Sequence, residues 1–289
     1  MGTLVDARNI RGVYYTGGKD VVAVDDVSLR VEEGEVLGLA GESGSGKTTL
    51  GSIIALTARP PLHVERGALE IDGKVQELGG DARVPRTWRG SVVSMLPQGA
   101  MNSISPTKRV RHLVWDVMRS HSRISKEVAL ERARERITTL GLPARVLDAY
   151  PHQLSGGMKQ RVVTIISTLL NPRLLVADEP TSALDVSSQK ILIEMLLEML
   201  DQKIMSGVIF VTHDLPVLRT VATKIAVMYQ GRVVERGPTQ LMVDRPQHPY
   251  TKALMSSVLT PEPKYSKIRI EGMSGFDRSE FDAPAVIHS

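Results

Sequence analysis

The segment GESGSGKTT at residues 41–49 constrains the fold most strongly, because it fits the phosphate-loop pattern G-x-x-x-x-G-K-[ST]. It follows the apolar run EVLGLAG and precedes a helical pattern that begins near Lys47. Glycines within it allow the backbone N–H groups to point inward at a phosphate. Lys47 would reach the β- and γ-phosphates, and the Thr48 hydroxyl would bind Mg²⁺. The alternative, a Gly/Ser-rich connection with an incidental lysine, is disfavoured by the flanking strand and helix.

Two adjacent carboxylates follow another apolar strand pattern, since residues 174–177 lead directly into Asp178 and Glu179. Carboxylates at the end of a buried strand are costly unless they bind a cation or take part in chemistry. We expect Asp178 to hold Mg²⁺ through water and Glu179 to polarise the attacking water. The alternative is that both residues only cap the next helix.

Two further polar side chains follow strand patterns. His213 comes after IFVT, and its strand should lie beside those that end at the phosphate loop and at Asp178. We therefore expect His213 to face the γ-phosphate, although a histidine in such a position is often only structural. Gln98 follows SVVSMLP and is a candidate for sensing Mg²⁺ or the attacking water.

A second anion-binding pattern, LSGGMKQR at residues 154–161, opens a predicted helix with Ser155, Gly156 and Gly157. A hydroxyl and unhindered N–H groups at a helix N-terminus favour an anion. An ordinary N-cap would explain Ser155 but not two glycines, each of which weakens a helix by about 1 kcal/mol. Because no adjacent lysine or metal ligand completes a site, the pattern predicts half of an ATP site that another subunit completes.

Composition excludes several kinds of site. The chain has no cysteine, which rules out disulfides, thiolate zinc sites, cysteine-ligated clusters and a cysteine nucleophile. A formal net charge of +4 is too small to indicate nucleic-acid binding by itself. The first residues lack a signal-peptide core, and no apolar run approaches the roughly 18 residues that a membrane helix needs. We expect a cytoplasmic chain that does not itself cross a membrane.

Turn and strand patterns give a coarse secondary structure. The first 75 or so residues have the pattern of short strands, with a hairpin turn at residues 72–73, and a last hairpin turns at residues 230–231. The apolar runs at 174–178 and 207–212 are typical of parallel strands buried on both faces.

Helical periodicity appears after Ser125, a candidate N-cap, and the GLP at residues 141–143 ends it. A shorter helical pattern spans residues 249–258. From about Pro261 onward, and especially over the last fifteen residues, we expect little order.

In chain order, GESGSGKT, Gln98, LSGGMKQR, LLVADEP, SALD and His213 resemble the motifs of an ATP-binding-cassette (ABC) ATPase over about residues 3–237. The resemblance implies an α/β P-loop NTPase core with a mixed sheet, an N-terminal antiparallel β-subdomain and a helical subdomain inserted at about residues 99–160. Residues 1–237 would form the ATPase domain, and residues 238–289 a C-terminal extension with a partly disordered tail. It also implies head-to-tail dimers that clamp ATP between one phosphate loop and the other subunit's LSGG.

The resemblance also assigns roles to single residues. Tyr14 looks like the aromatic residue that stacks on adenine, with Tyr15 as the alternative, and Asp185 of SALD looks like a contact across the dimer. Residues 99–153 look like the part that docks on a membrane partner. The phosphate-loop residues that would contact ATP are Gly41, Glu42, Ser43, Gly44, Ser45, Gly46, Lys47, Thr48 and Thr49.

Three segments, YPHQLSGGMKQR, THDLPVL and HPYTKAL, resemble the oligopeptide/dipeptide-permease ATPases. This implies an importer subunit at the cytoplasmic face of the membrane. Its partners would be a second ATPase (a distinct homologue or another copy), two membrane permease subunits and, indirectly, an external solute-binding protein. The segment PQGAMNSISP differs from the sequence usual in this branch after the glutamine. The chain also lacks the cysteines that bind a cluster in the C-terminal extension of some relatives. Peptides, oligosaccharides and nickel all remain open as the transported solute.

Two other classes compete with a transport ATPase. A soluble ABC ATPase that acts on nucleic acid or ribosomes usually has two cassettes or a long coiled coil, whereas this chain has one phosphate loop and no extended heptad run. A P-loop kinase or GTPase would leave LSGGMKQR without a role. The sequence therefore predicts a transport-coupled ATPase that uses ATP and Mg²⁺ and does not bind nucleic acid.

Overall fold

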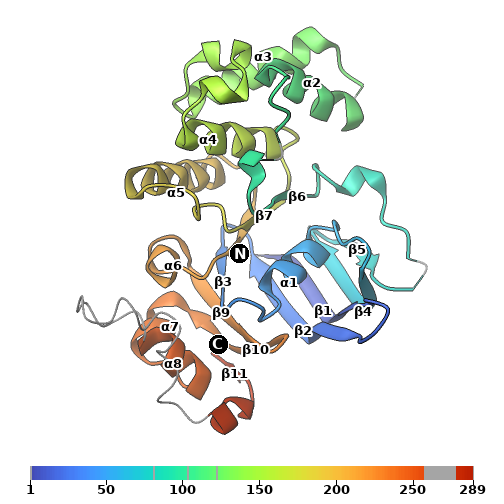
Figure 1. Cartoon of the computed structure of the whole chain (residues 1–289), viewed down its shortest axis with the longest axis vertical. Coiled ribbons are helices and arrows are strands. Elements are labelled where there is room, and N and C mark those ends of the chain that lie inside the picture. The colour runs from blue at the N-terminus through green and yellow to red at the C-terminus, as the bar shows by residue number, and fades with distance from the viewer. Residues whose placement is uncertain (1, 81, 103, 122, 257–277, 289) are drawn as a thin grey trace.

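Two β-sheets pack against helix α1 (Lys47–Ile54) in the computed structural model of the chain (Figure 1). The structure describes residues 2–288 apart from 81, 103, 122 and 257–277. The larger sheet has seven strands in the order β11-β10-β9-β3-β8-β7-β6. Their bounds are β3 Val36–Ala40, β6 Val93–Leu96, β7 Leu174–Asp178, β8 Gly207–Val211, β9 Lys224–Tyr229, β10 Arg232–Pro238 and β11 Val286–Ile287.

The larger sheet is mixed, as predicted. Strands β6, β7, β8, β3 and β9 run parallel, whereas β10 pairs antiparallel with β9. Every residue of β3, β7 and β8 is buried, which confirms the prediction of parallel strands covered on both faces. Since parallel strands end at one edge of a sheet, the residues that follow β3, β7 and β8 meet there.

The smaller sheet is antiparallel, in the order β2-β1-β4-β5. The predicted turn joins β4 to β5 at Asp72 and Gly73, whose φ angles of 53° and 72° suit a tight hairpin. β1 and β2 have 12 residues each and are longer than the short strands we expected, because one face of each is covered by the core around α1. The bounds are β1 Thr3–Tyr14, β2 Val21–Glu32, β4 Leu62–Ile71 and β5 Lys74–Glu77.

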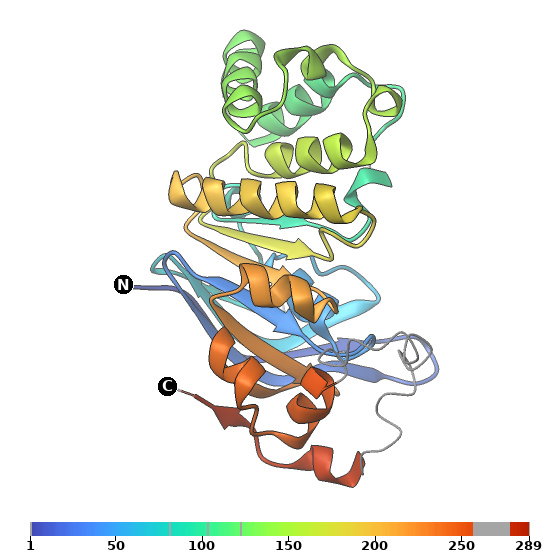
Figure 2. The same cartoon turned by 90° about the vertical axis from the view of Figure 1, so that its left-hand side faces the viewer.

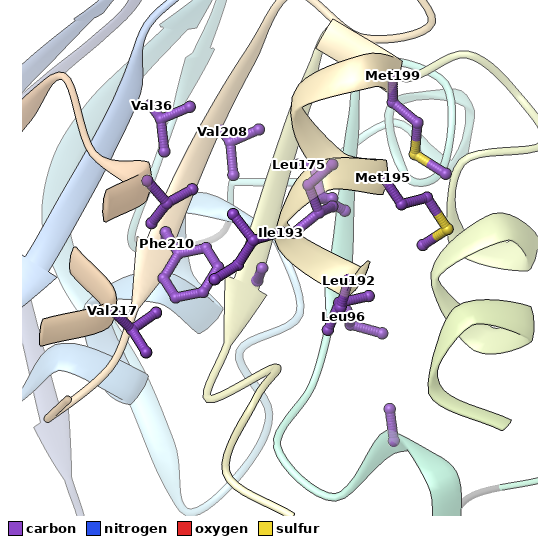
Figure 3. Close-up of a cluster of buried hydrophobic side chains, with 14 of the residues drawn as sticks. Val36, Leu96, Leu175, Leu192, Ile193, Met195, Met199, Val208, Phe210 and Val217 are labelled. Atoms are coloured by element: carbon purple, nitrogen blue, oxygen red, sulfur yellow. The ribbon is translucent and has the colours of Figure 1, made fainter. Parts of the chain in front are cut away.

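Helices α5 (Val186–Asp201) and α6 (Leu215–Val221) cover the other face of the larger sheet. Figure 3 shows this layer, in which Phe210 of β8 faces Ile193 of α5 and Val217 of α6. Burying side chains of this size stabilises the fold by about 1.5–3 kcal/mol each. The layer thereby holds the sheet edge that carries the polar residues.

The predicted helical subdomain lies at one end of the molecule, beyond α5 (Figure 2). The Ser125 hydroxyl accepts a hydrogen bond from the Val128 amide (3.3 Å), and Gly141 with φ 74° follows the helix end, both as predicted. Among the described helices, none is both long and apolar enough to cross a membrane. This region and the loop before it contain η1 Arg86–Trp88, η2 Ala100–Asn102, α2 Val110–His121, α3 Lys126–Thr139, η3 Ala144–Asp148, η4 Pro151–Gln153 and α4 Gly156–Ser167.

The C-terminal extension packs against β10 through α7 (Thr239–Asp244), α8 (Pro249–Ser256) and β11. It also contains η6 (Arg278–Asp282). The helix predicted at 249–258 is thus α8, although residues 257 and 258 lie outside the described residues.

The expectation of little order after Pro261 needs a correction for the end of the chain. Residues 261–277 lie outside the described residues, but residues 278–288 form η6 and β11. β11 pairs parallel with β10, and the His288 ring contacts the buried Glu235 carboxylate at 2.7 Å. Phe281 is also buried, so packing and an internal polar contact fix this segment.

Candidate functional site

The phosphate loop (residues 41–49) joins β3 to α1 at the carboxyl edge of the larger sheet. Its glycines Gly41, Gly44 and Gly46 have φ angles of 142°, 84° and 100°, which residues with a Cβ rarely adopt. A Cβ at Gly41 would lie 2.3 Å from the carbonyl oxygen of Met228, and one at Gly46 would lie 2.2 Å from that of Ala23. Two of the glycines are therefore required by neighbouring strands as well as by the curl of the loop.

Lys47, the first residue of α1, is only 7% exposed and lies within the loop. Its Nζ donates to the carbonyl oxygens of Gly41 and Glu42, both at 2.7 Å, and to the Ser45 hydroxyl at 3.4 Å. Burial lowers the pKa of Lys47, and the carboxylates of Asp178 and Glu179 oppose this shift. The ammonium is thus held by the loop's own carbonyl groups, within electrostatic reach of Asp178 and Glu179 at the sheet edge.

Asp178, Thr48 and Gln98 form the candidate magnesium site. Asp178 ends β7 with 1% exposure, and its Oδ1 accepts a hydrogen bond from the Thr48 hydroxyl at 3.1 Å. Burial raises the pKa of Asp178, whereas the Thr48 hydrogen bond and Lys47 act in the opposite direction. Gln98, which follows β6, lines a cleft of about 520 Å³ together with Thr48 and Asp178.

The donor set fits Mg²⁺, which prefers carboxylate, hydroxyl and carbonyl oxygens. No group of three or more His, Cys, Asp or Glu side chains in the described part of the chain could hold a metal ion. Magnesium sites that also bind nucleotides use few protein ligands, because water and phosphate oxygens complete the coordination. Magnesium bound here would neutralise charge on the phosphates.

Glu179 and His213 contact each other at the same edge. Glu179 Oε1 accepts a hydrogen bond from the His213 backbone N–H (3.0 Å) and lies 2.7 Å from His213 Nδ1. Its Oε2 accepts from the Thr212 hydroxyl at 3.1 Å. Glu179 is 9% exposed and has a φ of 47°, a strained conformation for a non-glycine residue. Strain of this kind clusters at functional sites, and here it aims a buried carboxylate at the sheet edge.

The two tyrosines proposed for adenine point to different neighbours. The Tyr14 hydroxyl lies 3.2 Å from the Thr49 hydroxyl on α1, whereas the Tyr15 hydroxyl donates to Glu65 at 2.6 Å. The Tyr15 ring also lies 5.2 Å from the His63 ring. Tyr14 ends β1 and contacts the phosphate loop, whereas Tyr15 follows the strand and is 42% exposed, so both stay candidates for the adenine prediction.

The LSGG segment (residues 154–157) forms the start of α4. The Ser155 hydroxyl caps this helix by accepting from the Met158 N–H at 3.3 Å. Gly156 is exposed, and a Cβ there would meet nothing within 4 Å. Figures 1 and 2 both show α4 apart from α1, so its exposed N-terminus does not belong to the chain's own phosphate loop.

Ser188, a residue that the sequence analysis did not single out, lies between Gly157 and Asp185. Asp185 caps α5 by accepting from the backbone N–H (2.9 Å) and the hydroxyl (2.8 Å) of Ser188. These hydrogen bonds lower the pKa of Asp185. A Cβ at Gly157 would lie 2.7 Å from the Ser188 hydroxyl oxygen. The second glycine of LSGG is therefore also required by close packing within the chain.

Sequence reasoning missed other residues of the site. Thr212 precedes His213 and supports Glu179, and Arg59 lines the same cleft as Thr48 and Gln98. Tyr250 lies in the segment HPYTKAL, to which the sequence analysis gave no role at the site. Thr212 contacts Glu179 across 33 positions, and Tyr250 contacts Glu42 across 208. Arg59 belongs to no motif, so no pattern within a strand or helix identifies these residues.

A phosphate loop at the carboxyl edge of parallel strands, with a carboxylate beside its threonine and a second carboxylate next to it, is the arrangement of a P-loop nucleoside triphosphatase. The family model for the ABC transporter matches residues 24–182, and that for the oligopeptide/dipeptide transporter, C-terminal region, matches residues 234–282. The chain belongs to the ABC transporter ATP-binding proteins of the oligopeptide/dipeptide import family.

Several relatives and solved structures resemble the chain. Oligopeptide transport ATP-binding protein OppD of Bacillus subtilis (strain 168) is 38% identical over 262 residues, which cover 90% of this chain and 73% of OppD. Dipeptide transport ATP-binding protein DppD of Escherichia coli (strain K12) is 39% identical over 265 residues, with coverages of 91% and 80%. A dimeric structure of the ATP-binding cassette MJ0796, bound to ADP and Pi after hydrolysis, matches with a TM-score of 0.68 and 25% identity, over 81% of this chain and 98% of that chain. The predicted fold class and ATPase activity are thereby confirmed.

Proposed function

We propose that the chain hydrolyses ATP as one of a pair of ABC subunits and drives peptide uptake through a membrane permease. The observation that carries this proposal is the exposed start of α4, which offers N–H groups to an anion while lying apart from α1. A dimer that brings a second phosphate loop to this helix would complete an ATP site. The dimeric MJ0796 cassette supports such a pairing.

Within one subunit, each residue around the phosphate loop would have a separate role. Lys47 would bind the β- and γ-phosphates, and Thr48, Asp178 and Gln98 would hold Mg²⁺. Tyr14 would stack on the adenine ring.

Hydrolysis needs a water molecule that is aimed at the γ-phosphate. The carboxylate of Glu179 would accept a hydrogen bond from this water and orient it. His213 contacts Glu179 and keeps a side chain that is 65% exposed, so its ring is available to the γ-phosphate. Thr212 holds the other carboxylate oxygen in place.

Three groups would reach the ATP of the second subunit. These are the Ser155 hydroxyl and the N–H groups of Gly156 and Gly157, with Asp185 contacting the dimer partner beside them. Asp185 hydrogen-bonds to Ser188, and Ser188 packs against Gly157. A shift of the start of α5 would therefore move the backbone at LSGG. This contact offers a route by which one ATP site senses the other.

Peptides are the substrate class that the relatives favour, since OppD and DppD are named for oligopeptides and dipeptides. The two relatives give no support to oligosaccharides or nickel. Accordingly, the partners would be a second ATPase subunit, two membrane permease subunits and an external peptide-binding protein. The chain would act at the cytoplasmic face of the membrane, with the helical subdomain docked on the permease.

Peptide uptake by the assembled transporter tests this proposal. The chain should co-purify with two multi-pass membrane proteins, and vesicles that contain the complex should accumulate a labelled peptide in an ATP-dependent manner. Lys47→Ala should abolish this uptake. Uptake of an oligosaccharide in place of peptides, or co-purification with ribosomes in place of membrane proteins, would contradict the proposal.

A further inference from the structure

One hydrogen bond links the C-terminal extension directly to the phosphate loop. The Tyr250 hydroxyl accepts a hydrogen bond from the backbone N–H of Glu42 at 2.9 Å, across 208 positions of sequence. Tyr250 lies on α8 and is completely buried. Glu42 itself is exposed, so the buried hydroxyl holds in one orientation an N–H that could otherwise turn to water.

Aromatic packing fixes the ring of Tyr250. Its centroid lies 4.5 Å from that of Tyr229, at the end of β9, and 5.4 Å from that of Phe281 in η6. The Tyr250 backbone N–H donates to His248 Nδ1 at 3.2 Å. Burial raises the pKa of Tyr250, so the phenol stays neutral at physiological pH. The C-terminal extension thus holds a neutral hydroxyl at a fixed place behind the phosphate loop.

The hydrogen bond engages a loop N–H that is then not available to phosphate. Glu42 donates its N–H to Tyr250 and accepts from Lys47 Nζ through its carbonyl at 2.7 Å, so one residue contacts both. A second hydrogen bond from outside the loop runs from the Gly231 N–H to the Ser45 carbonyl at 3.0 Å. These two contacts hold the loop backbone at Glu42 and Ser45 through residues of α8 and of the turn after β9.

We propose that Tyr250 is a positioning residue for ATP, through which the C-terminal extension braces the phosphate loop in its nucleotide-binding shape. The inference rests on the proposed role of the phosphate loop and deepens it. Without the hydroxyl, the peptide at Glu42 is free to turn toward water when no nucleotide is bound. ATP must then reorder the loop, and this cost lowers affinity. Within the described part of the chain, the hydrogen bonds and ring contacts of Tyr250 involve Glu42, His248, Tyr229 and Phe281 rather than Asp178, Glu179 or His213, so the chemical step is unchanged.

Tyr250→Phe tests the proposal, because it keeps the ring and removes only the hydroxyl. For the purified full-length chain, the dissociation constant of a fluorescent ATP analogue should rise about three- to tenfold, the value of one ordinary hydrogen bond. In the assembled transporter, the KM for ATP should rise by a similar factor, while kcat stays within about twofold of the wild-type value. Amide hydrogen exchange across residues 42–46 should quicken.

Tyr229→Phe is the matched control. It removes a hydroxyl from the same aromatic cluster, but this hydroxyl accepts a hydrogen bond from the exposed Gln230 side chain, at 3.0 Å, rather than from the phosphate loop. It should change neither ATP affinity nor exchange at residues 42–46. A structural role alone would lower the unfolding temperature of Tyr250→Phe without changing its ATP affinity.

Two results would overturn the inference alone: wild-type affinity in a folded Tyr250→Phe chain, or an equal loss of affinity in Tyr229→Phe. Failure of the wild-type chain to bind the ATP analogue would instead overturn the assignment of the phosphate loop, and this inference with it.

Discussion

Replacing Glu179 with glutamine should stop ATP turnover and leave ATP binding intact. Both carboxylate oxygens are occupied, one by the backbone and ring of His213 and the other by the Thr212 hydroxyl. A glutamine amide has nearly the same shape. Its oxygen can still accept from the His213 backbone, and its NH₂ group can donate to the Thr212 hydroxyl oxygen. The fold should therefore persist while the negative charge that orients water is lost.

The size of the effect follows from the role of that charge. A positioned general base contributes about 10²- to 10⁴-fold to a rate. This corresponds to about 2.7–5.5 kcal/mol of activation free energy, at roughly 1.36 kcal/mol per factor of ten. Phosphate release by the assembled transporter at saturating ATP measures kcat directly. Because bound ATP is no longer hydrolysed, size-exclusion chromatography with Mg²⁺ and ATP should also show a trapped dimer of ATPase subunits.

His213→Ala is the companion variant. It removes the contact from Nδ1 to Glu179 but keeps the backbone N–H and the Thr212 hydroxyl, so hydrolysis should fall more than ATP binding. A kcat of Glu179→Gln within threefold of the wild-type value would refute the assignment of Glu179, since about 0.65 kcal/mol is too little for a catalytic base.

Two other perturbations have defined outcomes. Lys47→Ala removes the buried ammonium beside Glu42 and should weaken binding of an ATP analogue by about 10- to 100-fold, which equilibrium titration would reveal. Burial opposes ionisation of Glu235, but hydrogen bonds from His288 and from backbone N–H groups nevertheless lower its pKa. A lowered carboxyl pKa gives stability that is present above the ordinary carboxyl value and is lost as pH falls through the folded-state value. Glu235→Gln should therefore cost about 1–3 kcal/mol of unfolding free energy at pH 7, and this cost should vanish in acid. Denaturant titrations of the wild-type chain and of Glu235→Gln at pH 7 and in acid check this prediction. An equal loss of unfolding free energy under both conditions would contradict the link to Glu235 ionisation.

The parts of the fold that sequence predicted well are those fixed by local patterns. β3, β7 and β8 are uninterrupted apolar runs, and such runs need cover on both faces. The hairpin turns at residues 72–73 and 230–231 follow from residues that tolerate positive φ. Because three parallel strands end at one edge, the meeting of Lys47, Asp178 and His213 could also be predicted.

Contacts between distant segments could not be predicted in this way. Tyr250 reaches Glu42 only because α8 packs against β10, and no local pattern encodes that placement. Gly157 approaches Ser188 for a similar reason. The neighbours of Tyr14 and Tyr15 also come from distant segments, since Tyr14 contacts Thr49 on α1 and Tyr15 contacts Glu65 on β4.

The end of the chain was misjudged for an energetic reason. The last residues of a chain are poorly ordered unless contacts fix them, so we expected little order there. One buried Phe281 and the contact of His288 with the buried Glu235 nevertheless hold η6 and β11 in place.

The central claim is that LSGG of this chain contacts ATP held by another subunit. Gly156→Asp is the suitable variant, since a side chain at Gly156 meets nothing within 4 Å, whereas one at Gly157 would press on Ser188 of its own chain. A carboxylate about 5 Å from a phosphate charge costs roughly 3 kcal/mol at an effective dielectric constant near 20, or more than a hundredfold in affinity.

The most direct measurement assembles a Gly156→Asp subunit with an intact partner ATPase and crosslinks a photoreactive ATP analogue to the complex. Separation of the subunits then shows which phosphate loop is labelled. Labelling should be lost at the partner's phosphate loop and kept at that of the mutant chain, and the isolated mutant should bind the analogue as the wild-type chain does. Loss of label from the mutant's own phosphate loop, with the partner's label intact, would contradict the shared site.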